Sequence, residues 1–366
     1  MVDPRIEEYA RLLVEECVDV QPGWQVVVIG QPLGRPLIEE VVRQVARRGA
    51  YSILRLGWHL GADLTWVKDA PEELVAKPAP AEWHLWDTID TYIGVVAPEN
   101  TRDGSNVPPE RIAAFSQAYR PVFEPYFAKE KPWVGCQYPT PALAQDAGMT
   151  LHEFEEFLYG AVLVDWNALR EQMRRIADRF DAGSEVRIVG EGTDLRFSLE
   201  ARLGEVDALG ANLPGGEIFY SPVEDSAEGE ITFSEYPACY LGRQVPGVHF
   251  RFEGGRIVEA DAAGDVDFLL STLDSDEGAR RLGEFGIGCN PGIQKHMRNT
   301  LFDEKIEGTV HLAVGQGFPF LGGTNKSAIH WDIVKDLRRG GRIELDGEVV
   351  QENGEWTGMG ETVFPP

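Results

Sequence analysis

Apolar and polar positions in the first half of the chain follow helical and strand periods in turn. Apolar residues three and four apart predict helices over 5–18 and 36–48, the first with Asp3 as its N-cap. A β-branched run, which suits a buried parallel strand, covers 24–30, and further strands are expected over 51–56, 91–96 and 133–138. Because strands and helices alternate at the lengths of βαβ units, we expect a Rossmann-like open sheet.

More helices are expected towards the middle of the chain. Residues 109–127 combine helical spacing with an aromatic-rich face. Residues 150–180 are dominantly helical, and they begin with a capping box in which Glu153 follows Thr150 by three positions. The clearest break in composition comes next, at Asp181-Ala-Gly-Ser184, and we place a domain boundary there.

The second half changes to short strands separated by Gly and Asp turns. Strands are expected over 184–189, 194–199, 229–233, 248–252, 256–260, 342–348 and 349–356. Gly254-Gly255 and Asp346-Gly347 are hairpin signals, and one helix is predicted over 265–283. The predicted fold class is therefore α/β: an N-terminal Rossmann-like α/β domain (1–181), then a mainly antiparallel α+β C-terminal domain (182–366).

Composition narrows the possible partners. The chain has 366 residues, 43% of them hydrophobic, which suffices for cores in two domains. Its formal net charge of −26 argues against a nucleic acid or an anionic membrane as partner, because both require a basic surface. An acidic surface favours cations, although solubility explains it equally well.

Cysteine usage and the N-terminal segment point to one compartment. The four cysteines are dispersed without C-x-x-C spacing, so neither a disulfide scaffold nor a thiolate zinc site is expected. The first residues are acidic and amphipathic, unlike a signal peptide, and no apolar run reaches the roughly 18 residues of a membrane helix. Paired glycines such as Gly190 and Gly192 lack the third glycine of a dinucleotide fingerprint. We expect a soluble cytoplasmic protein without a nucleotide cofactor.

Candidate chemistry concentrates between Thr309 and Asp332, a stretch with two of the seven histidines. His330 and Asp332 form an H-x-D triplet, and residues two apart on a strand point to the same face. Together with His311 they offer two imidazoles and a carboxylate, a ligand set that divalent metals favour. Two unrelated strand histidines would give the same pattern.

Two glutamates stand out by context. Glu217 lies between two glycines and an aromatic run, and Glu284 ends the predicted helix over 265–283. A glutamate at a helix C-terminus opposes the helix dipole, which a nearby cation would offset. Taken alone, each glutamate is better read as a surface carboxylate, because the chain has 60 acidic residues.

At these residues the sequence resembles the aminopeptidase T family of thermophilic-type metalloaminopeptidases. The similar segments include GGEIFYSP, SDEGARRLGEFGIG, NTLFDEKIEGTVHLAVG and GGTNKSAIHWD, and the resemblance spans nearly the whole chain. It implies a homodimeric aminopeptidase that hydrolyses short peptides with a free N-terminus. It also implies two divalent metal ions (Zn, Co, Mn or Mg) that share an activated water. The implied ligands are Glu217, Glu284, His311, His330 and Asp332, with the two glutamates also in catalytic roles and one of them bridging the ions.

The chain departs from this family at Phe318, where the family commonly has a tyrosine. Phenylalanine has no hydroxyl, so it can neither stabilise an oxyanion nor bind a metal. Loss of one such donor costs on the order of 10²–10³ in rate. Tyr220, Asn325 and Ser327 are candidates to supply a replacement donor.

Two other functions fit the same residues. His311, His330 and Asp332 alone make the 2-His-1-carboxylate set of mononuclear iron(II) oxygenases, and a ring-cleaving dihydroxypyridine dioxygenase resembles the same fold family. A catalytically weak, metal-binding homologue is the second alternative. The presence of both Glu217 and Glu284 favours the two-metal peptidase.

Overall fold

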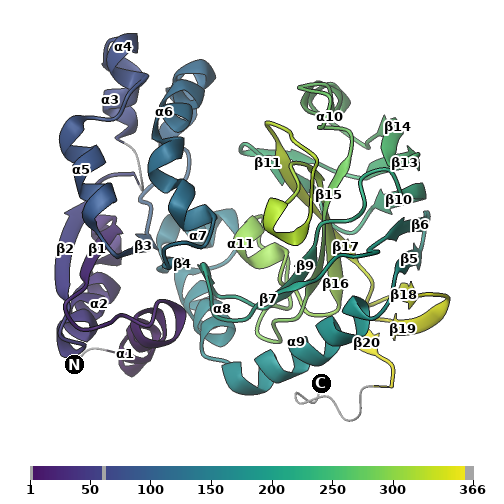
Figure 1. Ribbon diagram of the computed structural model, residues 1–366, viewed down its shortest axis with the longest axis horizontal. Coiled ribbons are helices and arrows are strands. Elements are labelled where there is room, and N and C mark those ends of the chain that lie inside the picture. The colour runs from purple at the N-terminus through teal and green to yellow at the C-terminus, as the bar shows by residue number, and fades with distance from the viewer. Residues whose placement is uncertain (1–2, 60–62, 359–366) are drawn as a thin grey trace. The chain divides into compact units, whose positions relative to one another are not determined.

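The computed structural model describes residues 3–59 and 63–358, which divide into two compact units (Figure 1). The first unit comprises Met1–Leu163 with Leu209–Pro214, and the second comprises Val164–Ala208 with Gly215–Pro366. The helix Trp166–Asp181 (α9) groups with the second unit. This division reflects contacts between residues and does not test where independently folding domains meet. The domain boundary after Asp181 therefore stays a prediction.

The first unit is built on a five-stranded parallel sheet in the order β2-β1-β3-β4-β8. Its strands are β1 (Gln25–Gly30), β2 (Tyr51–Leu56), β3 (Thr91–Val96), β4 (Trp133–Gln137) and β8 (Asn212–Leu213). The four strands predicted in this half are confirmed, and β8 joins the edge from much further along the chain. The predicted Rossmann-like sheet is therefore present.

Helices of the first unit confirm most of the predicted segments. They are α1 (Pro4–Arg11), a π-helical turn η1 (Leu12–Cys17), η2 (Pro32–Gly34), α2 (Arg35–Arg47), α3 (Leu64–Asp69), α4 (Glu72–Val75), α5 (Pro80–Thr88), η3 (Asp103–Asn106), α6 (Pro109–Phe127), α7 (Pro141–Asp146) and α8 (Leu151–Val162). Asp3 caps α1, and Thr150 with Glu153 forms the predicted capping box of α8. The expected aromatic face of α6 packs Phe123 and Tyr126 against Trp86 of α5.

The second unit combines antiparallel sheets with a few helices. An eight-stranded sheet has the order β14-β13-β10-β6-β5-β18-β19-β20, a five-stranded sheet has the order β17-β16-β15-β9-β7, and β11 pairs with β12. The eight-stranded sheet contains β5 (Glu185–Gly190), β6 (Thr193–Ser198), β10 (Glu228–Phe233), β13 (Val248–Glu253), β14 (Arg256–Asp261), β18 (Arg342–Leu345), β19 (Glu348–Glu352) and β20 (Glu355–Trp356). The strands predicted over 184–189, 194–199, 229–233, 248–252 and 256–260 are confirmed. The predicted C-terminal hairpin is also present, but its strands are shorter than predicted, because turns at 346–347 and 353–354 divide 342–356 into β18, β19 and β20. The remaining elements are β11 (Ala238–Tyr240), β12 (Arg243–Val245), α10 (Val266–Leu273), α11 (Thr300–Asp303) and η4 (Pro319–Leu321).

Hairpin turns fall where the sequence places them. Gly254 and Gly255 connect β13 to β14, and Asp346 and Gly347 connect β18 to β19. All four residues have positive φ, as a two-residue hairpin turn with the right twist requires.

The five-stranded antiparallel sheet corrects one prediction. It contains β7 (Glu205–Asp207), β9 (Glu217–Tyr220), β15 (Leu282–Gly288), β16 (Thr309–Gly315) and β17 (His330–Asp336). The helix predicted over 265–283 ends at Leu273, and Glu284 lies inside β15 rather than at a helix end. All residues of β15 are buried, so the strand lacks the alternation of apolar and polar residues that would identify it.

One face of this sheet belongs to the core of the second unit. Phe285 of β15 packs against Phe197 of β6 and Phe180 of α9. The opposite face carries the candidate ligands, because alternate residues of a strand point to opposite sides. In the described part of the chain no disulfide joins the cysteines, and no helix is both long and apolar enough to cross a membrane.

Candidate metal centre

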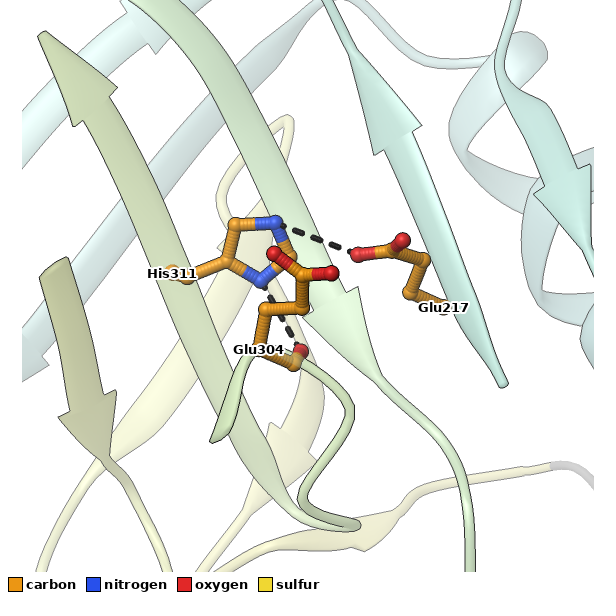
Figure 2. Close-up of side chains that lie close together, drawn as sticks. All are labelled: Glu217, Glu304 and His311. Atoms are coloured by element: carbon orange, nitrogen blue, oxygen red, sulfur yellow. Dashed lines mark hydrogen bonds and ion pairs between the residues drawn. The ribbon is translucent and has the colours of Figure 1, made fainter. Parts of the chain in front are cut away.

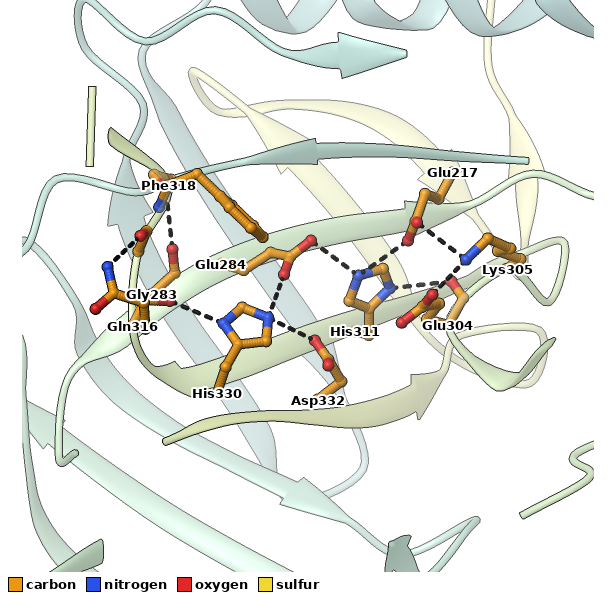
Figure 3. Close-up of polar contacts among 12 residues, drawn as sticks. Glu217, Gly283, Glu284, Glu304, Lys305, His311, Gln316, Phe318, His330 and Asp332 are labelled. Atoms are coloured by element: carbon orange, nitrogen blue, oxygen red, sulfur yellow. Dashed lines mark hydrogen bonds and ion pairs between the residues drawn. The ribbon is translucent and has the colours of Figure 1, made fainter. Parts of the chain in front are cut away.

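Strand register brings the five predicted ligands to one face of the sheet β17-β16-β15-β9-β7. Asp332 of β17 and Glu284 of β15 are both paired with Ala313 of β16, on either side of it. His311 of β16 is paired with Gly286, two positions beyond Glu284, so the two side chains share a face. Figure 3 shows the imidazoles of His311 and His330 on either side of the Glu284 carboxylate.

Glu284 contacts both histidines through different oxygen atoms. Its Oε2 lies 2.9 Å from Nε2 of His330, and its Oε1 lies 3.4 Å from Nε2 of His311. Glu284 is 4% exposed, and His311 is completely buried. One carboxylate thus spans the space between two imidazole nitrogens.

A second carboxylate faces each imidazole from the outside. Oε2 of Glu217 lies 3.4 Å from Nε2 of His311, and Oδ1 of Asp332 lies 3.5 Å from Nε2 of His330. Both oxygen atoms are buried without a hydrogen-bond partner among the described residues. Buried polar atoms are normally partnered, so two orphaned carboxylate oxygens beside imidazole nitrogens fit a centre that binds cations.

Both histidines are oriented by the backbone. Nδ1 of His311 lies 3.0 Å from the carbonyl oxygen of Glu304, and Nδ1 of His330 lies 2.8 Å from that of Gln316. A carbonyl oxygen only accepts hydrogen bonds, so each Nδ1 carries the proton and donates it. Each Nε2 is thereby directed to the carboxylates, as in histidines that bind metals.

The carboxylates favour charged imidazoles in the metal-free protein. Burial alone would lower the pKa of His311, but the carboxylates of Glu284 and Glu217 raise it to about 9. His330 likewise has its pKa raised well above the ordinary value by Asp332 and Glu284, against the effect of burial. Burial alone would raise the pKa of Asp332, but the neighbouring imidazole of His330 lowers it to about 2.

A buried ammonium and a further carboxylate extend the cluster, and the sequence did not single them out. Nζ of Lys305 lies 3.0 Å from Oε1 of Glu217 and also pairs with the Glu304 carboxylate. Glu304 offers a ligand atom close to those of Glu217 and His311 (Figure 2). Glu284, His311 and Asp332 form a second such group. Nothing in the sequence distinguishes Glu304 from the other acidic residues.

Gly286 leaves room for the imidazole of His311. A Cβ atom at position 286 would lie 1.9 Å from Cε1 and Nε2 of that ring, far inside van der Waals contact. A side chain there would push the imidazole away from Glu284. Glycine at this central strand position is thus required by the close approach of a ligand side chain.

Phe318 borders the cluster, whereas the proposed substitutes for a tyrosine point elsewhere. The Phe318 ring lies 5.3 Å from the His330 ring, measured between centroids. The hydroxyl of Tyr220 is on the opposite face of the sheet and lies 3.0 Å from Oδ1 of Asp181. Asn325 donates to backbone carbonyls, including that of Gly278 at 2.9 Å, and Ser327 donates to Asp276 at 2.9 Å. None of these three side chains is therefore directed at the histidines.

Comparisons with known proteins agree with this arrangement. The chain matches the profile of the family described as thermophilic metalloprotease (M29) over residues 2–356. Aminopeptidase 2 of Geobacillus stearothermophilus is 27% identical, across 97% of this chain and 98% of its own length.

Solved structures share the fold. Wild-type AmpT from Thermus thermophilus superposes with a TM-score of 0.81 at 23% identity, covering 97% of this chain and 99% of its own. A 2,5-dihydroxypyridine dioxygenase from Pseudomonas putida KT2440 gives a TM-score of 0.63 at 13% identity, covering 96% and 97%. Both likenesses concern the fold, and they agree with the predicted α/β arrangement.

Proposed function

The chain belongs to the thermophilic metalloprotease (M29) family, and we propose that it removes N-terminal residues from short peptides with two divalent ions. Its relatives include named aminopeptidases, so the chain is a metalloaminopeptidase that depends on divalent metal. The proposal adds the number of ions and their ligands. Those ligands are the five residues predicted from the sequence: Glu217, Glu284, His311, His330 and Asp332.

The contacts of Glu284 carry the proposal. One of its oxygens faces His330 and the other faces His311, so the carboxylate suits a bridge between two positions. Asp332 completes the position at His330, and Glu217 completes the position at His311. Each position then has an imidazole, one carboxylate of its own and a share of Glu284, a donor set suited to zinc, cobalt or manganese.

Bound divalent ions supply Lewis acidity, which lowers the pKa of a water molecule and polarises a peptide carbonyl. The residues of the chain decide where this chemistry occurs. Backbone carbonyls hold both imidazoles in place, and Glu284 keeps the two positions together. The named aminopeptidases among its relatives support exopeptidase over endopeptidase activity.

Phe318 supports a modified form of this mechanism. Its ring lies beside His330 and presents an apolar edge where a tyrosine would present a hydroxyl. We propose that Phe318 limits access of water without stabilising an oxyanion. Phe318→Tyr is then expected to raise kcat by about tenfold, less than the 10²–10³ attributed to an evolved donor. An unchanged kcat would remove any role for a hydroxyl at this position.

The dioxygenase alternative has weaker support. A mononuclear iron centre at His311, His330 and Asp332 would not use Glu217 as a ligand, and it would leave the buried Oε2 of Glu217 without a hydrogen-bond partner among the described residues. The likeness to the dihydroxypyridine dioxygenase concerns the fold only. The second alternative, a catalytically weak metal-binding homologue, predicts bound metal without turnover of peptide substrates.

Metal analysis joined to a peptidase assay tests the proposal. The full chain is expected to hold about two manganese, cobalt or zinc ions and to cleave aminoacyl-p-nitroanilides and short peptides. His330→Ala should lose at least one ion and nearly all activity. His249→Ala, which changes a histidine of β13 that pairs with Thr232, is the matched control and should keep both.

Three results would contradict the proposal. They are full activity in His330→Ala, one iron per chain with ring cleavage, and two bound ions without any turnover. The predicted homodimer is tested on the same material by light scattering.

A further inference from the structure

Lys305 is a buried cation within the proposed two-ion centre. Its side chain is completely buried, and Nζ lies 3.0 Å from Oε1 of Glu217 and in contact with the Glu304 carboxylate (Figure 3). The backbone holds this residue on both sides. Its N–H donates to the carbonyl of Phe302 at 3.0 Å, and its carbonyl accepts from Asn290 at 3.0 Å. The ammonium is therefore fixed in place beside the cluster.

The two proposed metal positions differ because of this ammonium. At the His330 position, the carboxylates of Glu284 and Asp332 form ion pairs with imidazoles. At the His311 position, one oxygen of Glu217 already pairs with Lys305, which leaves Oε2 to face the imidazole. A fixed positive charge at buried ligands repels an incoming cation and competes with it for the carboxylate.

We propose that Lys305 weakens ion binding at the His311 position, so that the two ions bind with different affinities and load in a fixed order. The His330 position fills first. Until the second ion arrives, the ammonium pairs with both Glu217 and Glu304. This role explains how the buried carboxylates of Glu217 and Glu284 and the partly buried ones of Glu304 and Asp332 gather in one cluster before metal binds, since buried charges need compensation. The inference rests on the two-ion function proposed above.

Lys335 provides a matched control. It is also a buried lysine of the second unit, and its Nζ donates to Oε1 of Glu235 and to the carbonyl oxygen of Thr232, both at 2.8 Å. It lies on β17, with its side chain on the face opposite to His330 and Asp332. Lys335→Met removes a buried ammonium without changing the candidate ligands.

The experiment is a Mn²⁺ titration of the full chain, monitored by calorimetry. The unmodified protein is expected to show two classes of site that differ at least about tenfold in Kd. Lys305→Met should tighten the weaker class by about 10- to 100-fold, the range seen when groups that contact metal ligands are changed. Lys335→Met should leave both classes unchanged.

Thermal unfolding in a chelator gives a second readout that does not depend on catalysis. Lys305→Met should lower the metal-free midpoint, because Glu217 and Glu304 lose their counter-charge, and saturating Mn²⁺ should restore it. Lys335→Met should lower the midpoint with and without Mn²⁺. Lys305→Gln, which keeps a hydrogen-bond donor but removes the charge, is measured alongside in case the methionine variant folds only with metal.

The outcomes separate this inference from the proposed function. Two unequal classes that stay unchanged in both Lys305 variants would overturn the role of Lys305 and leave the two-ion centre standing. One ion in the unmodified protein and two in Lys305→Met would support the role of Lys305 while overturning the two-ion function. One ion in every variant would overturn both.

Discussion

The parallel sheet of the first unit and the five-stranded antiparallel sheet of the second both contain largely buried strands, such as β1 and β15, but different interactions stabilise them. Val26, Val27 and Val28 of β1 are completely buried and need no specific partner. Glu284 and His311 are as deeply buried, yet they are stable there only as members of an ion-paired cluster. Apolar burial stabilises the first sheet without any bound ion, whereas the charged cluster of the second depends on protons or metal ions.

The largest expected effect comes from changing a buried glutamate in each unit. Glu284→Gln removes the negative charge shared by two imidazoles, and kcat/KM should fall on the order of 10³-fold, since breaking a buried pair costs about 3–5 kcal/mol. Glu40→Gln alters a glutamate of α2 that is equally buried and pairs with Arg43, and activity should stay unchanged. Equal losses of activity in the two variants would show that Glu284 has no special role compared with another buried glutamate.

A glycine in each sheet gives the next effect. Gly286→Ala places a methyl group against His311, so metal affinity should fall by about 10- to 100-fold and stability by about 1–3 kcal/mol. Gly135→Ala in β4 meets nothing closer than 3.6 Å and should be tolerated. Chelator competition and thermal unfolding measure both quantities. A silent Gly286→Ala would mean that the imidazole does not need its present position.

Metal removal should act on one sheet only. Binding to the folded state stabilises it by about 2.7 kcal/mol at a free-ion concentration about 100 times the Kd. Hydrogen exchange after chelation should therefore speed up in β15, β16 and β17 and stay constant in β1 and β3. Uniform loss of protection over both sheets would show that the units do not respond separately.

The smallest expected effect is the release of protons from the two histidines when metal binds. The same protons make the stability of the metal-free protein depend on pH. The folded-state pKa of His311 is about 9, above the ordinary value of 6.5, so protonation stabilises the metal-free protein below about pH 6.5 and this contribution is lost as the pH rises through 9. Metal ions require the neutral imidazole and should expel about two protons per chain at pH 7.5, one each from His311 and His330. Calorimetry in two buffers of different ionisation enthalpy measures them. Binding without proton release would exclude charged imidazoles in the metal-free cluster.

The same contrast explains what the sequence could predict. Strands such as β1 and β3 are continuous runs of apolar and β-branched residues, and helices such as α2 have a clear apolar stripe, so the first sheet follows from pattern alone. Strand β15 contains Gly283, Gly286 and Gly288 around one charged residue, and that pattern has no strand period. The glycine at position 286 is required by the close approach of the His311 imidazole, and that approach is visible only in the folded structure.

Residue type and family resemblance were enough to predict the candidate ligands from the sequence, but not the residues that contact those ligands. His330 and Asp332 share a strand, so their alignment follows from local geometry. Lys305 and Glu304 lie on the loop that precedes β16, and their contact with Glu217 depends on pairing between distant segments. Edge strand β8 has two residues, too few to identify from sequence. It pairs with β4, which lies far earlier in the chain, so its place in the sheet depends on a long-range contact.

Anomalous diffraction from crystals of the full chain grown with Mn²⁺ tests the central claim most directly. Two anomalous peaks are predicted, one between His330 and Asp332 and one between His311 and Glu217, with the Glu284 carboxylate between them. A single peak shared by His311, His330 and Asp332, with Glu217 still paired to Lys305, would contradict the two-ion centre.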